Sequence, residues 1–346
     1  MKVIIQIPCL NEEHTLPITL AELPRQLDGV DELEWLIIDD GSTDNTLQVA
    51  REHGVEHIVR HNGNKGLATA YQSGLNACLQ LGADIIVNTD ADNQYPGRYI
   101  ADLVRPIVDG TADMVIGDRQ TGSIEHFSTT KKILQGLGSA VVRFVSGTTI
   151  PDAPSGFRAI SRETALRFNV LTSYTYTLET IIQAGRKNLS IRHVPINTNP
   201  KTRDSRLFKS MWKYVRRSAV TILRLFLLYR PLATFSYIAL PFLVVGLGLW
   251  ARYGVLILQG DTARGANVQS IIVGAALLII GFVVFLIGLL GDLIAINRRL
   301  HEETLYYLKK LVLVDEAYHA THIQTTRAPQ NPEAELKNTE ITFDRS

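Results

Sequence analysis

The sequence contains only two cysteines, Cys9 and Cys78, and both stand among apolar residues. Two cysteines cannot form the framework of several disulfides that stabilises small secreted domains. Their spacing also matches no cysteine-based metal site. We therefore predict that both are thiols in a hydrophobic core.

The chain also lacks a secretory leader and a glycine-rich dinucleotide turn. Residues 2–7 lead directly into an apolar strand, with no small-residue cleavage site behind them, so we expect the soluble part to stay in the cytoplasm. The turn after that strand, residues 9–13, has no glycine, which excludes a nicotinamide-dependent dehydrogenase. It offers Asn11 and Glu12 instead, which can hydrogen-bond a base or a ribose, or cap the next helix.

Two long segments contain almost no charge. Residues 232–258 include a single charged side chain, Arg252, and residues 271–291 include none. Each segment exceeds the ~20 residues that cross a bilayer as a helix, and both are too long for a buried hairpin of a soluble protein. The sequence therefore predicts a transmembrane hairpin, with helices at about 232–258 and 271–296.

The residues around this hairpin predict its orientation and its packing. Both flanks are basic, so the positive-inside rule predicts that the soluble part and both termini lie in the cytoplasm. The protein would then be a multi-pass protein of the cell membrane. Gly274, Gly281 and Gly288 recur every seven residues, which gives one face of small residues. We expect this face to pack closely, either within the hairpin or between subunits of a homo-oligomer.

Residues 201–230 carry nine lysines and arginines against one carboxylate, Asp204. Aliphatic and aromatic residues alternate with these cations. This pattern is typical of amphipathic helices at the surface of a membrane with anionic lipids, although a soluble helix with a basic face would share it. Because the hairpin follows directly, we predict membrane-interface helices at 205–230.

The remaining chain, residues 1–204, reads as a soluble α/β domain. Its central feature is the pair Asp90 and Asp92, which directly follows the apolar strand residues 83–87 and precedes a turn at Tyr95 and Pro96. Ligands bind at the carboxyl ends of strands in open α/β sheets. Two carboxylates two residues apart repel each other unless a cation lies between them, and oxygen ligands suit Mg²⁺ or Mn²⁺. Taken alone, the pair could also be a solvated acidic turn.

Other polar residues follow other strands of the same predicted sheet. Asp39 and Asp40 end the second strand, and Arg119 follows a strand at residues 114–116. Lys65 stands between glycines at a helix start, where the backbone can approach a diphosphate. The parallel strands therefore place several charged groups at one edge of one sheet.

Six motifs in this order resemble the inverting family-two glycosyltransferases of the GT-A fold, and most closely the polyprenyl-phosphate glycosyltransferases, which include the dolichyl-phosphate mannose synthases. The motifs, within a resemblance that covers about residues 1–297, are Pro8-Cys9-Leu10-Asn11-Glu12, Asp39-Asp40-Gly41-Ser42, Asn64-Lys65-Gly66, Asp90-Ala91-Asp92-Asn93-Gln94, Gly117-Asp118-Arg119 and Ser155-Gly156-Phe157-Arg158. The resemblance implies a Rossmann-like, mostly parallel catalytic domain at 1–204, interface helices at 205–230, a transmembrane hairpin at 231–297 and a cytoplasmic tail at 298–346. We expect the tail to be disordered towards its end.

The resemblance also implies roles for individual residues. The nucleotide-sugar site would comprise Pro8, Leu10, Asn11, Glu12, Ile38, Asp40, Lys65, Asp90 and Ala91. The metal, Mg²⁺ or Mn²⁺, would be held by Asp92 and Gln94, and the lipid phosphate by Arg119, Arg158, Arg203 and Arg206. Asp90, Asp92, Arg119 and Glu179 would form the catalytic group. Leu10, Asp118 and Arg206 depart from the residues common in the family, so the base and the sugar stay open.

The expected reaction transfers a hexose from a nucleotide-diphosphate sugar, of the UDP-glucose or GDP-mannose type, to undecaprenyl or dolichyl phosphate, with inversion. A phosphate nucleophile is already ionised at pH 7, so this reaction needs cations rather than a strong base. A hydroxyl acceptor would need a base, for which Glu179 is the candidate. The Gln-x-x-Arg-Trp motif of processive polysaccharide synthases is absent. The sequence is also compatible with a non-catalytic membrane scaffold or a nucleotidyltransferase, and no nucleic-acid partner is expected.

Overall fold

The computed structural model describes residues 1–120, 142–143, 146–170, 176–200, 220, 227, 230–259, 268–326 and 339–342, with side chains up to residue 313. The chain divides into two compact units. The first combines Met1–Val215 with Glu303–Ser346, and the second is Arg216–Glu302. The predicted interface helices at 205–230 lie almost entirely outside the described residues.

The described residues of the first unit form a sheet of eight strands in the order β7-β5-β6-β4-β1-β2-β3-β8. In chain order the strands are β1 (Lys2–Cys9), β2 (Glu32–Asp39), β3 (His57–Arg60), β4 (Ile85–Asn88), β5 (Met114–Asp118), β6 (Arg158–Ser161), β7 (Ile191–Pro195) and β8 (Thr339–Thr342). Only β6 is antiparallel to its neighbours, β4 and β5. The predicted mostly parallel sheet is therefore confirmed.

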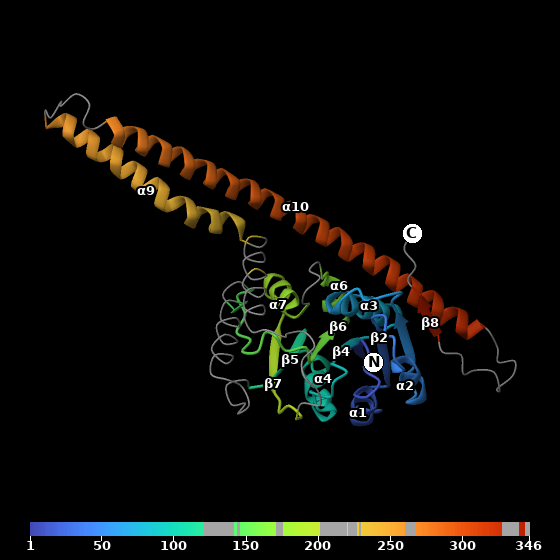
Figure 1. Cartoon of the computed structure of the whole chain (residues 1–346). Coiled ribbons are helices and arrows are strands. Elements are labelled where there is room, and N and C mark those ends of the chain that lie inside the picture. The colour runs from blue at the N-terminus through green and yellow to red at the C-terminus, as the bar shows by residue number, and fades with distance from the viewer. Residues whose placement is uncertain are drawn as a thin grey trace. The chain divides into compact units, whose positions relative to one another are not determined.

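Helices cover both faces of this sheet (Figure 1). They are α1 (Leu16–Glu22), α2 (Thr46–Glu52), α3 (Leu67–Gln80), the 3₁₀ turn η1 (Gly97–Tyr99), α4 (Ile100–Val108), α6 (Arg162–Arg167) and α7 (Tyr176–Arg186). In Figure 1, α3, α6 and α7 lie on one face, and α1, α2 and α4 lie on the other. Because both faces are covered, successive residues of β1 such as Val3, Ile4 and Ile5 are all fully buried. Each such side chain contributes roughly 1.5–3 kcal/mol when it leaves water.

Strand β6 is a feature that the sequence analysis missed. It lies between β4 and β5, with Asn88 opposite Arg158 and Met114 opposite Ile160. The strand is four residues long and begins with an arginine inside a turn-rich segment, so it carries no alternating pattern. Its insertion places the turn before Arg158 directly beside the end of β4.

The C-terminal residues of the first unit pack on the catalytic domain. Helix α10 (Val268–Thr326) continues beyond the apolar segment, and the Tyr306 hydroxyl donates a hydrogen bond to Glu163 of α6 (2.7 Å). The Lys309 ammonium donates to the Phe168 carbonyl (2.9 Å). Strand β8 then pairs in parallel with β3. The expectation of disorder towards the end of the tail is wrong for residues 339–342, because their backbone pairs with the edge of the sheet.

The second unit contains α9 (Pro231–Leu258) and the first part of α10. Both helices are long and apolar enough to cross a membrane. Within this unit the glycines of the predicted small-residue face of α10 lie against α9: a Cβ at Gly274 would meet Trp250, one at Gly281 would meet Leu243, and one at Gly288 would meet Phe235. The glycine face therefore packs within the hairpin.

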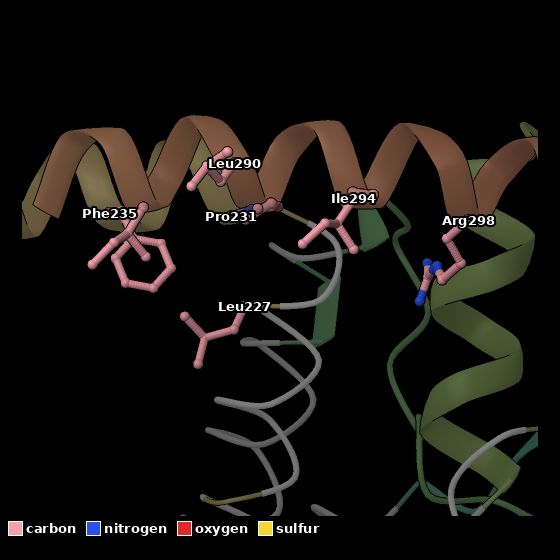
Figure 2. Close-up of a pocket in the computed structure, with 9 residues that line it drawn as sticks. Leu227, Pro231, Phe235, Leu290, Ile294 and Arg298 are labelled. Atoms are coloured by element: carbon pink, nitrogen blue, oxygen red, sulfur yellow. The ribbon is translucent and has the colours of Figure 1, made fainter. Parts of the chain in front are cut away.

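The hairpin unit also contains a cavity of about 310 Å³ (Figure 2). It is lined by Leu227, Pro231, Phe235, Ile287, Leu290, Gly291, Ile294, Ala295 and Arg298. The lining is apolar except for Arg298, whose guanidinium lies 3.3 Å from the Glu302 carboxylate. This cavity includes none of the residues at the carboxyl edge of the sheet.

Candidate active site

The loops after β1 and β2 are hydrogen-bonded to each other. The Asn11 N–H donates to Ser42 Oγ (2.9 Å), and the Thr43 N–H donates to Asn11 Oδ1 (2.8 Å). Asn11 adopts a positive φ of 55°, which asparagine tolerates better than most residues. Asn11 therefore fixes the shape of these loops, in addition to its predicted role in nucleotide binding.

Glu12 is buried beside the start of α1. Its carboxylate accepts a hydrogen bond from the Thr15 hydroxyl (2.6 Å), and its N–H donates to Thr46 Oγ1 (2.8 Å). Glu12 thus joins the first loop to helix α2. Of the other residues predicted for the nucleoside pocket, Pro8 lies opposite Ile38 in the β1–β2 register, and the Ile38 side chain is fully buried against Gly74 of α3.

Asp40 organises the loop that carries Lys65. Its carboxylate accepts hydrogen bonds from the backbone N–H groups of Lys65 and Gly66, both at 2.8 Å, and lies 2.7 Å from His61 Nδ1. Burial would raise the pKa of Asp40, but the His61 and backbone hydrogen bonds outweigh it, so the pKa is lowered overall. The ionised carboxylate therefore holds this loop against the end of β2, while the Lys65 side chain remains exposed.

The Asp90–Gln94 loop follows β4 at the centre of the sheet. The Gln94 N–H donates to Asp92 Oδ1 (3.1 Å), and the Ala91 carbonyl accepts from the Thr19 hydroxyl (3.0 Å). The Asp90 carboxylate lies against Gly156, where a Cβ would be 3.2 Å from both of its oxygens. Asp90, Asp92 and Gln94 therefore share one loop at the end of β4, and their roles as metal ligands stay a prediction.

The environment of Asp90 disfavours its charge. Burial, and then the neighbouring Asp92, raise the pKa of Asp90 to about 7, and the cations Arg119 and Arg158 act in the opposite direction. Two carboxylates in this position need nearby positive charge to stay ionised together. Arg119 and Arg158 supply part of this positive charge.

Arg119 is held in place at the end of β5 by Asp152. Its Nε and Nη2 donate to the two oxygens of Asp152 (2.7 and 2.9 Å), and its backbone N–H donates to the same carboxylate (3.1 Å). Both side chains are largely buried. The pairing uses Nε and Nη2 of the guanidinium, so Nη1 can still face an anion.

Arg158 does not fit its predicted role as a ligand of the lipid phosphate. Its side chain is fully buried on β6. The guanidinium donates to the Thr180 hydroxyl (2.7 Å), the Thr177 carbonyl (3.3 Å) and the Ser155 carbonyl. Arg158 therefore joins the turn before β6 to α7, and its burial leaves no surface for direct contact with a lipid.

Glu179 lies in the first turn of α7 and is also buried, with 1% of its surface exposed. The Gln183 amide donates to its carboxylate (3.4 Å). Its role as a general base stays a prediction. Arg203 and Arg206 lie outside the described residues. The chain before them passes the Asp90–Gln94 loop, because the Asn199 N–H donates to the Gln94 carbonyl (3.0 Å).

Two features of the site were not found from the sequence. One is Asp152, whose signal was its place in the Asp-Ala-Pro-Ser-Gly-Phe-Arg segment. The other is a buried network at Asn88, two residues before Asp90. The Asn88 amide donates to the Gly156 carbonyl and to the Tyr176 hydroxyl, both at 2.9 Å, and accepts from Gln6 (3.0 Å). This network fixes the end of β4 to α7, and nothing in the local sequence indicates it.

The residues at the end of β4 fit Mg²⁺ or Mn²⁺, which substrate phosphates help to bind, better than a metal such as zinc that protein side chains bind by themselves. Within the described part of the chain, no group of three or more His, Cys, Asp or Glu side chains could hold a metal ion. Magnesium is commonly bound by one or two carboxylates together with substrate phosphates, whereas a zinc site takes three or four protein ligands. Asp92, with Asp90 beside it, matches the first type.

Comparison with known proteins agrees with this geometry. Residues 4–166 match the sequence model of the family described as glycosyl transferase family 2. The undecaprenyl-phosphate mannosyltransferase of Micrococcus luteus is 31% identical over 206 residues, which are 57% of this chain and 83% of that protein. The UDP-N-acetylglucosamine–dolichyl-phosphate N-acetylglucosaminyltransferase of Methanococcus voltae is 31% identical over 217 residues, which are 56% of this chain and 83% of that protein.

Solved structures share the fold of the first unit. Glucosyl-3-phosphoglycerate synthase from Mycobacterium tuberculosis, in complex with Mn²⁺, UDP and glucosyl-3-phosphoglycerate, aligns with a TM-score of 0.52 at 21% identity, over 65% of this chain and 78% of that one. The alignment identifies the GT-A fold. With the family match and the two relatives, it leads to the conclusion that this chain belongs to glycosyltransferase family 2 and is a glycosyltransferase.

Proposed function

We propose that this protein is a membrane-anchored, inverting glycosyltransferase that moves a hexose from a nucleotide-diphosphate sugar to a polyprenyl phosphate at the cytoplasmic face of the membrane. The observation that carries the proposal is the Asp90–Asp92 pair at the end of β4, with the Arg119–Asp152 pair close by. The two relatives named above act on undecaprenyl and dolichyl phosphate, which supports the choice of acceptor.

In this proposal the loops after β1, β2 and β3 bind the nucleotide. Asn11 and Glu12 have fixed backbones, and Asp40 holds the Lys65 loop in place before the donor arrives. Lys65 is exposed and can approach the donor diphosphate. Such preorganisation lowers the entropic cost of binding.

The acceptor phosphate attacks the anomeric carbon from the side opposite the nucleotide. Its second pKa is about 6, so it is ionised at pH 7 and needs no strong base. Arg119 binds the phosphate and lowers the repulsion between two anionic substrates. When bound by Asp92 with the donor diphosphate, Mg²⁺ or Mn²⁺ stabilises the negative charge on the leaving nucleoside diphosphate.

The helical unit suits a lipid acceptor. Its two helices are long enough to span a bilayer, and the lining of its cavity is apolar except for Arg298, which lies beside Glu302. Figure 2 places the side chains of Phe235, Leu290 and Ile294 in this lining. An isoprenoid chain matches the apolar part of this lining.

The test is transfer by the full-length protein purified in detergent. It is incubated with Mg²⁺ or Mn²⁺, polyprenyl phosphate and a panel of UDP- and GDP-sugars, and the lipid-linked sugar is measured. Asp92→Ala is expected to abolish product. Asp102→Ala removes a carboxylate from the exposed surface of α4 and serves as the matched control.

Product from one donor, lost in Asp92→Ala and kept in Asp102→Ala, supports the proposal and identifies the sugar. Donor consumption without lipid product favours a hydroxyl acceptor. The observation behind that second candidate is the buried carboxylate of Glu179 in α7, and Glu179→Gln would then be the next variant. Nucleotide binding without turnover of any donor would point to a scaffold.

A further inference from the structure

Asn199, in the segment that follows β7, is hydrogen-bonded to the backbone of the Asp90–Gln94 loop. Its N–H donates to the Gln94 carbonyl (3.0 Å), and its side-chain amide donates to the Asn93 carbonyl (3.0 Å). Asn199 is 106 residues away from Asn93 in the sequence, so this contact depends on the fold and not on local turn geometry. One residue therefore holds two successive carbonyl groups of the loop.

Glu22, the last residue of α1, accepts hydrogen bonds from both asparagines. Its Oε1 lies 3.1 Å from Asn93 Nδ2, and its Oε2 lies 3.1 Å from Asn199 Nδ2. Helix α1 ends directly against the chain that follows the loop, because a Cβ at Gly97 would clash with the Glu22 carbonyl oxygen. Three segments that are distant in sequence thus meet at the side chains of Glu22, Asn93 and Asn199.

The backbone of Asn93 explains why the loop needs this support. Asn93 has a φ of 55°, in the left-handed region that is uncommon for residues other than glycine. A residue in this region costs free energy and keeps its conformation only where the surrounding structure holds it. The side chain of Asn93 is bound by Glu22 and its carbonyl by Asn199, so these two residues hold the conformation from both sides.

The conformation of Asn93 bears directly on the predicted metal ligands. Asp92 and Gln94 are its two neighbours in the chain, so its φ sets the direction of one relative to the other. The Gln94 N–H also donates to Asp92 Oδ1 (3.1 Å), which closes the loop between them. If Asn93 relaxed to a negative φ, the carboxylate of Asp92 and the side chain of Gln94 would no longer point to the same place.

We infer that Asn199 is a positioning residue, which together with Glu22 holds the loop in the conformation that binds the divalent cation. The inference rests on the proposed function of this site. Asn199 acts through the backbone of Asn93 and Gln94 and supplies no ligand itself. The segment after β7 thereby becomes part of the metal site, although it contributes no atom to the coordination of the metal.

Removal of the Asn199 amide gives a specific expectation for metal binding. Asn199→Ala keeps the backbone N–H but loses the donor to the Asn93 carbonyl and to Glu22. The full-length protein in detergent is titrated with Mn²⁺ alone, and free Mn²⁺ is detected by electron paramagnetic resonance. Mn²⁺ affinity is expected to fall by about tenfold, as is common when a residue that supports a metal site is changed.

The matched control is Asn197→Ala, the same substitution two residues earlier in the same segment. Asn197 is exposed, and its backbone N–H donates to the Tyr99 hydroxyl (3.3 Å). Alanine keeps this N–H, so the variant is expected to bind Mn²⁺ with the affinity of the wild type. A tenfold loss in both alanine variants would contradict a specific role of the Asn199 side chain.

A double variant separates this mechanism from general damage. Glu22→Ala removes the other support of Asn93 and is expected to lower Mn²⁺ affinity as well. In Glu22→Ala/Asn199→Ala the affinity is expected to fall no further than in the weaker-binding single variant, because both residues act on the same backbone conformation. Two independent losses would add up to about a hundredfold. Thermal unfolding curves give the folded fraction of each variant, so that affinities refer to folded protein.

Unchanged Mn²⁺ affinity in Asn199→Ala overturns the inference, and so does a fully additive loss in the double variant. If Asn199→Ala does not fold, Glu22→Ala decides the matter, because the inference requires the same loss there. A wild-type protein that binds no Mn²⁺ would overturn both the inference and the metal site. A wild-type protein that binds Mn²⁺ but gives no lipid-linked sugar with any donor would overturn only the proposed transfer reaction.

Discussion

At the scale of single residues, the carboxylates of the site differ in how many hydrogen bonds they already accept within the fold. Both oxygens of Asp40 accept backbone hydrogen bonds, and both oxygens of Asp152 are occupied by Arg119. Asp90 instead lies against a glycine, with its charge disfavoured. The first two therefore shape the site, and the role of Asp90 in the reaction stays a prediction.

Gly156 leaves little space beside the Asp90 carboxylate. A Cβ would lie 2.9 Å from the Tyr176 hydroxyl and 3.2 Å from the Asp90 oxygens. We expect Gly156→Ala to displace the Asp90 carboxylate and to reduce glycosyl transfer by about 100-fold, a loss typical of a 1 Å misplacement. Transfer rates under saturating substrates provide the measurement.

The matched control for that variant is Gly248→Ala, because a Cβ at Gly248 has no atom within 4 Å. It is expected to retain wild-type transfer. Equal rates for both alanine variants would contradict the close approach of Gly156 to Asp90.

Asp40 yields a prediction about pH. Its pKa is lower in the folded protein than in an unfolded chain, so its charge stabilises the fold above about pH 4, and this contribution is lost as the pH falls through the folded value. Asp40→Asn should cost roughly 1.5–3 kcal/mol at pH 7, the range for hydrogen bonds to a charged group. The melting temperature of the variant relative to wild type, measured from pH 7.5 to pH 3.5, tests this.

We expect that difference in melting temperature to persist down to about pH 5 and to shrink below about pH 4. Asp102→Asn, on the exposed surface of α4, is the control and should follow the wild-type curve. A difference that grows as the pH falls would have the wrong sign for this explanation.

At the scale of elements, the long strands and the apolar helices could be predicted from the sequence, whereas β6 and β8 could not. Buried parallel strands such as β1 and β2 form continuous apolar runs, and the pattern alone identifies them. Strand β6 begins with an arginine, and β8 has the sequence Thr-Glu-Ile-Thr, so neither forms an apolar run, and both depend on pairing with strands far away in the chain. Local propensity carries little information about such pairing.

The same distinction applies to the site. The acidic loops after β1, β2 and β4 follow directly from strand ends, so Asn11, Asp40 and Asp90 could be located from the sequence. The Asp152 partner of Arg119 is 33 residues away from it, and the burial of Arg158 follows from the unpredicted strand β6. Roles that depend on contacts distant in sequence therefore required the structure.

The hairpin gives a prediction for helix packing. At Gly281, an added Cβ would lie 2.8 Å from the Leu243 side chain and 3.2 Å from the Leu243 backbone nitrogen. We expect Gly281→Val to separate α9 from α10 and to cost about 1–3 kcal/mol, as overpacking does elsewhere. Melting temperatures in detergent provide the measurement.

Gly254→Val is the appropriate control on α9, since a Cβ there has no atom within 4 Å. It should melt close to the wild type. If Gly281→Val also melted close to the wild type, α9 and α10 would not be in close contact at this glycine.

At the scale of the whole molecule, the two units differ in the solvent that they require. The first unit has a buried core on both sides of a sheet, and the second exposes large apolar side chains such as Tyr237, Leu258 and Ile294. Exposed apolar surface of this extent suggests association with a membrane. The charge pattern of the sequence predicts that the first unit faces the cytoplasm, and this orientation stays a prediction.

Cysteine labelling tests this orientation. Cys9 and Cys78 are buried, so the native protein should give little background with a membrane-impermeant maleimide. In intact cells, we expect Asp261→Cys, between the two apolar helices, to react. Thr111→Cys, exposed in the catalytic unit, should react only after the membrane is permeabilised. The reverse pattern would contradict the proposed orientation.

The spacing of the glycines in α10 has a geometric consequence. Gly274, Gly281 and Gly288 all face α9, and they are separated by seven residues. A straight α-helix drifts by about 20° over each such interval, so contacts at all three positions require α9 and α10 to wind around each other in a left-handed sense. One residue inserted between Gly281 and Gly288 would rotate the following glycine by about 100°. The packing of α10 on α9 therefore depends on the number of residues between these glycines. Two hairpins with the same amino-acid composition but different glycine spacing could differ in whether their helices wind around each other.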